Sequence, residues 1–172
     1  MSEFIEGLIR DVPDFPKPGI IYKDITPVLC DPRGLRESVH AMVEPFRDGV
    51  DVVVGIESRG FLFGAPIALE LGVGLALVRK PGKLPAATTG RDYELEYGTD
   101  TLEIHNDALE HGARALVVDD LLATGGTASA VVDLIGDIGG KVAGITFLIE
   151  LGFLPGRDRL APVPVHSVIR YD

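Results

Sequence analysis

The sequence has a single cysteine and no long apolar run, and these two shortages exclude whole classes of protein. Cys30 has no second cysteine to pair with, so an internal disulfide framework is excluded, and we expect its thiol to be an inert apolar group in a reducing compartment. No apolar run approaches the ~18 residues that indicate a membrane span. The N-terminus is acidic where a signal peptide is basic. We therefore expect a cytoplasmic protein with no membrane partner.

Basic residues are scarce relative to acidic ones. The chain has 16 Lys and Arg against 26 Asp and Glu, which gives a net charge of −10. Because a nucleic-acid surface needs a basic face to neutralise phosphates, nucleic acid is not an expected partner, whereas a local positive pocket can still take a small anion. The four histidines show no metal-ligand spacing, and we expect no metal site built from protein ligands alone.

The order of patterns along the 172 residues predicts one α/β domain. Apolar, β-branched runs predict buried strands at residues 51–56, 73–78, 115–118 and 142–149, and an edge strand at 163–169, which contains Pro164. Helical periodicity marks residues 34–46 and 126–138, and a third helix between 61 and 71 that starts or kinks at Pro66. This alternation predicts a doubly wound, mainly parallel central sheet. Residues 79–99 fall outside it and form a segment long enough to indicate a functional loop.

The strongest functional signal is the run Val117-Val118-Asp119-Asp120-Leu121-Leu122-Ala123-Thr124-Gly125-Gly126-Thr127. It predicts a strand that ends in two carboxylates, followed by a loop of small residues that enters a helix. A helix N-terminus offers free N–H groups and a positive dipole end, so this loop is expected to bind phosphate. Because carboxylates repel phosphate, Asp119 and Asp120 are expected to face sugar hydroxyls or a carbon that becomes cationic, or else to be a solvated strand end and a helix cap. Neither a Walker A loop nor a Rossmann fingerprint is present.

These eleven residues resemble the phosphoribosyl-pyrophosphate (PRPP) motif of the type I phosphoribosyltransferases. The particular residues at each position are similar to those of the adenine phosphoribosyltransferases. Further segments resemble the same family in the same order. Residues 15–27 resemble its base-holding hood, 55–61 its pyrophosphate loop, and 79–85 and 93–98 the two flanks of its mobile catalytic loop. Several motifs in one order make the resemblance more specific than any single motif.

The resemblance implies a reaction in which adenine and PRPP give AMP and pyrophosphate. It also implies a homodimer of a single domain, residues 1–172, with a hood mainly at 12–32 and a mobile loop at about 79–99. Mg²⁺ is expected to arrive with PRPP and to have few direct protein ligands, because it usually binds together with substrate phosphates.

Residue roles follow from the same resemblance. The residues implied to bind the 5′-phosphate are Ala123, Thr124, Gly125, Gly126 and Thr127, and those implied to bind the ribose hydroxyls are Asp119 and Asp120. Pyrophosphate binding is implied for Glu57, Ser58, Arg59, Lys80 and Lys83. Adenine binding is implied for Ile21, Tyr22 and Lys23. The residues implied to be catalytic are Glu96, Asp119, Asp120 and Arg59. Glu96 would exchange a proton with adenine while Tyr97 packs over the reacting centre, and the Glu57–Ser58 peptide is expected to be cis.

Some alternatives stay open at this stage. Glu96 can instead lie on the solvent-exposed face of a strand, because Tyr93, Leu95 and Tyr97 alternate with Glu94 and Glu96. Lys83 can be a solvated loop charge, and Glu150, which matches a family acid, can be a solvated strand end. Many family members have Phe and Arg in place of Tyr22 and Lys23, and residues 85–91 are the least similar stretch.

Two alternative functions also stay open. The base can be hypoxanthine or guanine, since 6-oxopurine enzymes share the PRPP loop. A PRPP-sensing regulator is disfavoured, because the chain has no spare ~50 residues for a DNA-binding domain and the wrong net charge.

Overall fold

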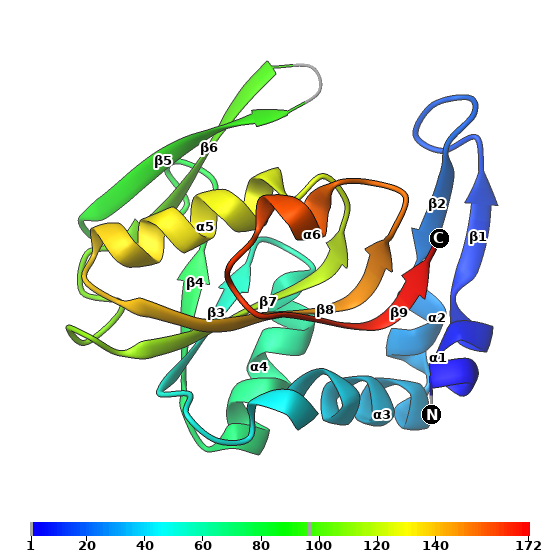
Figure 1. Cartoon of the computed structure of the whole chain (residues 1–172), viewed down its shortest axis with the longest axis horizontal. Coiled ribbons are helices and arrows are strands. Elements are labelled where there is room, and N and C mark those ends of the chain that lie inside the picture. The colour runs from blue at the N-terminus through cyan, green and yellow to red at the C-terminus, as the bar shows by residue number, and fades with distance from the viewer. Residues whose placement is uncertain (1, 96–97) are drawn as a thin grey trace. The chain divides into compact units, whose positions relative to one another are not determined.

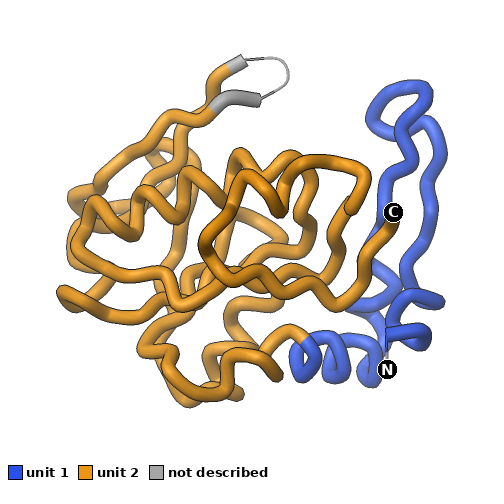
Figure 2. Tube along the Cα trace, viewed as in Figure 1, with its two compact units in different colours: residues 1–41 blue, residues 42–172 orange. Residues whose placement is uncertain are grey.

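The computed structural model describes residues 2–95 and 98–172 of the chain, which divides into two compact units (Figure 2). The first unit is Met1–Ala41 and the second is Met42–Asp172. The single domain that the resemblance implies stays a prediction. None of the helices in the described part of the chain has the length and apolar character needed to cross a bilayer.

The first unit is a short ribbon flanked by helices. It contains α1 (Ser2–Leu8), β1 (Arg10–Pro13), β2 (Ile21–Asp24), α2 (Thr26–Cys30) and most of α3 (Pro32–Val43). β1 and β2 pair antiparallel, and Arg10 faces Asp24 across the ribbon. Nε and Nη2 of Arg10 donate to Oδ2 of Asp24 at 3.0 and 2.6 Å, so the ribbon is closed by an ion pair at its helical end.

The second unit is a parallel sheet with helices on both faces. Its elements are η1 (a 3-10 helix, Glu44–Phe46), β3 (Val52–Ile56), α4 (Gly60–Leu71), β4 (Gly74–Val78), β5 (Thr88–Leu95), β6 (Gly98–His105), β7 (Arg114–Leu122), α5 (Gly126–Asp137), β8 (Lys141–Leu151), α6 (Gly156–Arg159) and β9 (Val165–Tyr171). The five-stranded sheet has the order β4-β3-β7-β8-β9, and all its pairs are parallel. Figure 1 shows α5 and α6 on one face and α4 on the other. The predicted doubly wound fold is confirmed, with β9 as the predicted edge strand.

The core of this unit forms where the predicted apolar runs lie. Val54, Val117, Leu134 and Phe147 belong to one buried cluster that joins the sheet to α5. The helix expected to start or kink at Pro66 begins at Gly60, six residues earlier, and continues through the proline. Burial of the apolar face of α4 on β3 and β7 stabilises this helix beyond its intrinsic propensity.

Residues 79–99 differ from the aperiodic loop that the sequence predicts. β5 pairs antiparallel with β6 from Thr88 opposite His105 to Leu95 opposite Gly98, so the alternation around Tyr93 reflects a strand. The hairpin is tied to the end of β4 by a short bridge: the N–H of Arg79 donates to the carbonyl of Glu103 at 2.9 Å, and the N–H of Glu103 donates back at 2.7 Å.

β7 is longer than predicted. It does not end at Asp119 and Asp120 but continues to Leu122, because β8 pairs with it as far as Leu122 opposite Glu150. Its pairing with β3 stops at Val118. The chain runs from β3 outward to β4 and later from β7 outward to β8 and β9, so β3 and β7 flank the switch point of the sheet. In open α/β sheets this is where a ligand crevice forms, at the carboxyl ends of the strands.

Candidate functional site

The two adjacent carboxylates lie at the switch point, on the part of β7 that extends beyond β3. The backbone N–H of Asp120 donates to Oδ1 of Asp119 at 2.9 Å, and Nε of Arg59 lies 3.2 Å from Oδ2 of Asp120. Burial raises the pKa of both carboxyl groups, and the charge of Asp120 raises the pKa of Asp119 further, while Arg59 lowers the pKa of Asp120. Such a pair favours a ligand that donates hydrogen bonds or carries positive charge.

Arg59 is brought to this pair by the close packing of α4 on β7. A Cβ atom added at Gly60 would lie 2.5 Å from the carbonyl oxygen of Val118 and 3.2 Å from Oδ1 of Asp119. Only glycine fits this contact, so the first turn of α4 abuts the backbone of β7. The predicted cis peptide precedes this turn, between Glu57 and Ser58.

The loop after β7 surrounds a small cavity at the N-terminus of α5. The cavity has a volume of about 80 Å³ and is lined by Asp119, Thr124, Gly125, Thr127 and other residues of the loop and strand. Gly125, the residue before the helix, has φ +77°, a conformation that favours glycine. The first N–H groups of this twelve-residue helix have no acceptor within the helix, and phosphate binding at this end stays a prediction.

The loop is held from behind by α6. A Cβ atom at Gly125 would lie 2.7 Å from the carbonyl oxygen of Gly156, and one at Gly156 would overlap the carbonyl oxygen of Ala123. Two glycines 31 positions apart therefore make a direct backbone contact. Gly156 was not identified from the sequence, because nothing local marks a glycine that contacts a distant loop.

The turns after β3 and β4 are tied together by Glu57. Its Oε2 accepts a hydrogen bond from the N–H of Lys80 at 2.8 Å and lies 3.3 Å from Nε of Arg79. The hydrogen bond from Lys80 is the main cause that lowers the pKa of Glu57. The carboxylate of Glu57 thus holds the turn that carries Lys80, while the exposed Lys83 follows in the same turn.

Lys80 reaches the hairpin, where two residues not identified from the sequence complete a small network. Its Nζ lies 2.8 Å from Oδ2 of Asp100, which also accepts a hydrogen bond from the hydroxyl of Tyr93 at 3.4 Å. The pKa of Lys80 is raised by its hydrogen bond to Asp100. Tyr93 also interacts with the side chain of Thr127, so the network joins the β4 turn, the hairpin and the first turn of α5. Tyr93 and Asp100 face each other in the register of β5 and β6, a pairing that the alternation around Tyr93 does not reveal.

The residues assigned to adenine lie together on β2 in the first unit. Ile21 is 59 % exposed, and the ring of Tyr22 packs edge-to-face on Phe15 with centroids 5.2 Å apart. Nζ of Lys23 lies 2.6 Å from Oδ1 of Asp11 on β1. This surface offers an aromatic ring and exposed apolar groups of the kind that a planar base stacks on.

Two predicted residues, Glu96 and Tyr97, lie outside the described residues. Across residues 2–95 and 98–172, the His, Cys, Asp and Glu side chains form no group of three or more that could hold a metal ion by themselves.

The chain is similar to known proteins over nearly its whole length. The family described as "Phosphoribosyl transferase domain" matches residues 23–163. An adenine phosphoribosyltransferase of Synechococcus sp. is 56% identical over 169 residues, which cover 98% of this chain and 99% of that protein. The crystal structure of the adenine phosphoribosyltransferase of Thermoanaerobacter pseudethanolicus has a TM-score of 0.95 at 52% identity and covers 99% of this chain and 100% of that one. That of Saccharomyces cerevisiae, complexed with adenine and an imino-altritol bisphosphate, has a TM-score of 0.92 at 38% identity, with 97% of each chain covered.

The contact between Gly125 and Gly156 predicts a measurable loss of stability. Gly125→Ala is expected to lower the free energy of unfolding by about 1–2 kcal/mol for the left-handed backbone, plus roughly 1–3 kcal/mol for the overlap with Gly156. Gly72→Ala is the matched control, because Gly72 has φ +69° and nothing within 4 Å of the added Cβ. Urea unfolding of the two variants compares them directly, and equal losses would contradict the contact.

Proposed function

The chain belongs to the phosphoribosyltransferase family, among the adenine phosphoribosyltransferases, and we propose that Asp119, Asp120 and the loop of residues 123–127 are its PRPP site. The enzyme transfers the 5-phosphoribosyl group from PRPP to adenine, giving AMP and pyrophosphate, which is a purine-salvage reaction. Adenine is favoured over the 6-oxopurines left open by the sequence, because the relatives with 51–56% identity are adenine enzymes. The observation that carries the proposed site is the carboxylate pair next to the cavity at the helix N-terminus.

In this proposal the 5′-phosphate binds in the cavity bounded by Thr124, Gly125 and Thr127. The free N–H groups and the positive end of α5 supply the attraction, and the threonine hydroxyls supply further donors. Ala123 and Gly126 complete the loop. Because glycine and alanine have little side chain, the backbone can approach the phosphate closely.

Asp119 and Asp120 are proposed to hold the ribose hydroxyls. Burial disfavours their negative charge, so hydroxyl donors and a developing positive charge at the ribose C1 both stabilise them. As pyrophosphate leaves and the base nitrogen attacks, C1 becomes oxocarbenium-like, and negative charge on the carboxylates that hold the ribose stabilises it. Catalysis then depends on positioning and electrostatics rather than on a covalent step with the protein.

The leaving pyrophosphate is proposed to bind Arg59, Lys80 and Lys83 together with the backbone of Glu57 and Ser58. Arg59 and Lys80 follow adjacent strands at the carboxyl edge of the sheet, which brings their charges to one side. In the free enzyme both are paired with carboxylates, Asp120 and Asp100. Since a carboxylate repels pyrophosphate, we assign to Glu57 a backbone contact and to its side chain the role of holding the turn of Lys80.

Mg²⁺ is proposed to enter as part of the substrate, bound to phosphate oxygens of PRPP. Carboxylates are hard oxygen ligands that suit Mg²⁺. Because Asp120 is already paired with Arg59, however, the protein itself offers few ligands, which fits a metal that binds mainly to substrate oxygens. Mg²⁺ supplies positive charge that offsets the charge of the leaving pyrophosphate. The chain itself orients the ribose and binds the two ends of PRPP.

Adenine is proposed to stack on the exposed apolar surface of Ile21 and Tyr22, with Lys23 beside it. Tyr keeps the stacking face of the Phe found in many members, whereas Lys lacks a planar guanidinium. Glu96 is proposed to exchange a proton with the base and Tyr97 to cover it; both roles stay predictions.

The homodimer and the cytoplasmic location are also proposals. A surface of exposed leucines on α4 and the edge strand β4 supports the homodimer: Leu62, Leu69 and Leu75 are 46%, 84% and 36% exposed. Leu62 and Leu69 share one helix face, because they are seven residues apart. A second copy of the chain is the proposed occupant, since exposed apolar patches mark interaction sites and a two-fold dimer joins the same patch on both subunits. The single cysteine agrees with a reducing compartment.

A product assay tests the function. The protein is incubated with Mg²⁺ and PRPP and with adenine, hypoxanthine or guanine in separate reactions. AMP is expected from adenine alone. Product from an oxopurine would contradict the assignment of the base, and PRPP binding without product from any base would favour the sensor alternative.

Neutralising the carboxylate pair is expected to abolish most of the activity. The double variant Asp119→Asn/Asp120→Asn is expected to lower kcat/KM about 100-fold or more, because charges aimed at the developing cation are lost. The fold is expected to stay intact, since burial already disfavours these charges. Asp107→Asn, at an exposed turn, is the matched control. A loss of less than about tenfold, 1.4 kcal/mol, would contradict the ribose assignment.

Leu69→Asp is expected to convert the dimer to a monomer, because a charge would be buried in an apolar interface. Sedimentation velocity measures the change. Phe153→Asp, at a 66 % exposed apolar residue after β8, is the control and is expected to leave the dimer intact. A dimeric Leu69→Asp variant, or a monomeric parent protein, would exclude this surface.

A further inference from the structure

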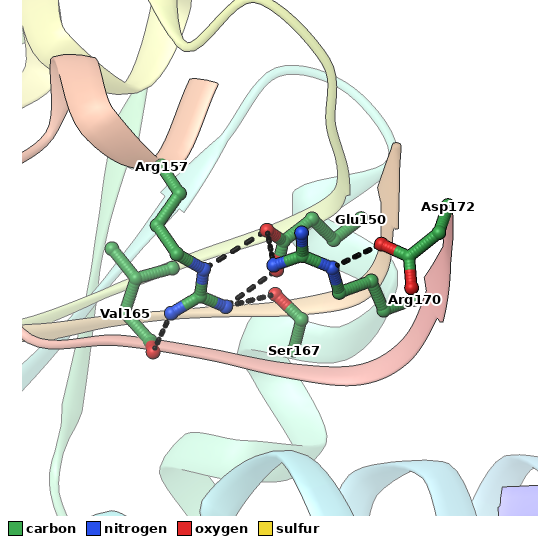
Figure 3. Close-up of polar contacts among 6 residues, drawn as sticks. All are labelled: Glu150, Arg157, Val165, Ser167, Arg170 and Asp172. Carbon is green, nitrogen blue, oxygen red and sulfur yellow. Dashed lines mark hydrogen bonds and ion pairs between the residues drawn. The ribbon is translucent and has the colours of Figure 1, made fainter. Parts of the chain in front are cut away.

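Glu150 is a buried acid near the carboxyl end of β8, not the solvated strand end that the sequence left open. Its side chain is 3% exposed, and it lies between Leu122 of β7 and Arg170 of β9 in the strand register. Figure 3 shows the guanidinium groups of Arg157 and Arg170 converging on it. A buried carboxylate needs such partners, because an unpaired charge is costly away from water.

The stronger of the two partners is Arg157, on α6. Its Nε donates to Oε1 of Glu150 at 2.9 Å and its Nη2 donates to Oε2, so the pair is a two-pronged fork (Figure 3). A bidentate pair of this kind fixes orientation as well as distance. Arg170 makes a single, longer contact to Oε1 at 3.2 Å and directs its Nε to Asp172.

Two further contacts join the half-exposed Arg157 to β9. Nη1 donates to the carbonyl oxygen of Val165 at 2.9 Å, and Nη2 lies 3.4 Å from Oγ of Ser167. The guanidinium is therefore directed at Glu150 and β9 rather than toward the cavity at α5. Although it is a cation near the loop proposed to bind phosphate, Arg157 is oriented as a structural anchor.

What Arg157 anchors is α6, and α6 begins on the loop. The residue immediately before Arg157 is Gly156, whose backbone is in contact with Ala123 and Gly125. α6 spans only Gly156–Arg159, too short to hold its own position. The buried Leu160 adds an apolar contact, which is not directional, whereas the fork of Arg157 is a directional side-chain contact between α6 and the sheet.

We propose that Glu150 and Arg157 are positioning residues for the 5′-phosphate: their fork holds Gly156 against Ala123 and Gly125 and so fixes the N–H groups of the loop. This inference rests on the proposed PRPP site. Neither residue touches the substrate. Loosening the fork lets α6 and the loop shift together, which weakens the contacts to the 5′-phosphate and leaves the rest of the site in place.

The test isolates the contribution of the 5′-phosphate. Calorimetry measures the dissociation constants of AMP and of adenosine, two ligands that differ only in that phosphate. Their ratio, Kd of adenosine over Kd of AMP, reports on the loop and does not depend on the folded fraction. For Glu150→Gln and for Arg157→Lys the ratio is expected to fall about tenfold, through weaker AMP binding, with adenosine binding unchanged.

Two controls separate positioning from stability. Arg114→Lys breaks a similar fork, in which Nε and Nη2 of Arg114 donate to Asp51 at 2.9 and 2.8 Å, at the start of β7 and far along the strand from the loop. Arg170→Lys weakens the second contact to Glu150 without touching α6. Both variants are expected to keep the parent ratio, even where they lower the melting temperature.

Each outcome decides between the hypotheses. A parent ratio well above one with a lowered ratio in both fork variants supports the proposal. A parent ratio near one would overturn the phosphate assignment itself, whatever the variants do. A normal ratio in folded Arg157→Lys, or an equal fall in Arg114→Lys or Arg170→Lys, would overturn the positioning role. If Glu150→Gln does not fold, Arg157→Lys carries the test, because it keeps the positive charge beside Glu150.

Discussion

Strand β7 keeps its pairing with β8 to Leu122 after its pairing with β3 has stopped at Val118. This difference in length forms a step in the sheet, and Asp119 and Asp120 lie on it. The two acids are thus held in a strand that still pairs with β8, while β3 no longer pairs beside them. Arg59 follows β3 and reaches Asp120 on this step, and the loop before α5 begins where β7 ends. The positions of Arg59 and of the loop therefore both depend on the step.

Three of the cations at the carboxyl edge of the sheet are paired with carboxylates before any substrate arrives. Arg59 pairs with Asp120, Lys80 with Asp100, and Arg79 with Glu57. An anion that meets only one of these cations gains little, because it replaces one negative partner with another. A ligand with several phosphate groups can meet several cations and the helix N-terminus together. The pairing therefore favours a polyanion of the right length over simple anions, on a protein whose net charge is −10.

The sequence predicted those features that depend on local pattern. Apolar runs identified the strands of the sheet, and the apolar periodicity of residues 126–138 identified α5. The extension of β7 was missed because two acids interrupt the apolar run, although pairing with β8 continues through them. The partner of Lys80 was missed for another reason: Asp100 reaches it only through the register of a hairpin. Contacts between distant segments, such as Gly125 with Gly156, depend on packing that no local pattern encodes.

The residues proposed for the base and those proposed for PRPP belong to different compact units of one chain. β1 and β2 pair with each other, and the sheet that carries the PRPP residues contains neither of them. A change on the ribbon therefore does not alter the strand pairing beneath the phosphate loop. In evolutionary terms the two parts can diverge at different rates: the amino-terminal unit can be retuned to another nucleobase while the sugar-phosphate chemistry is inherited intact.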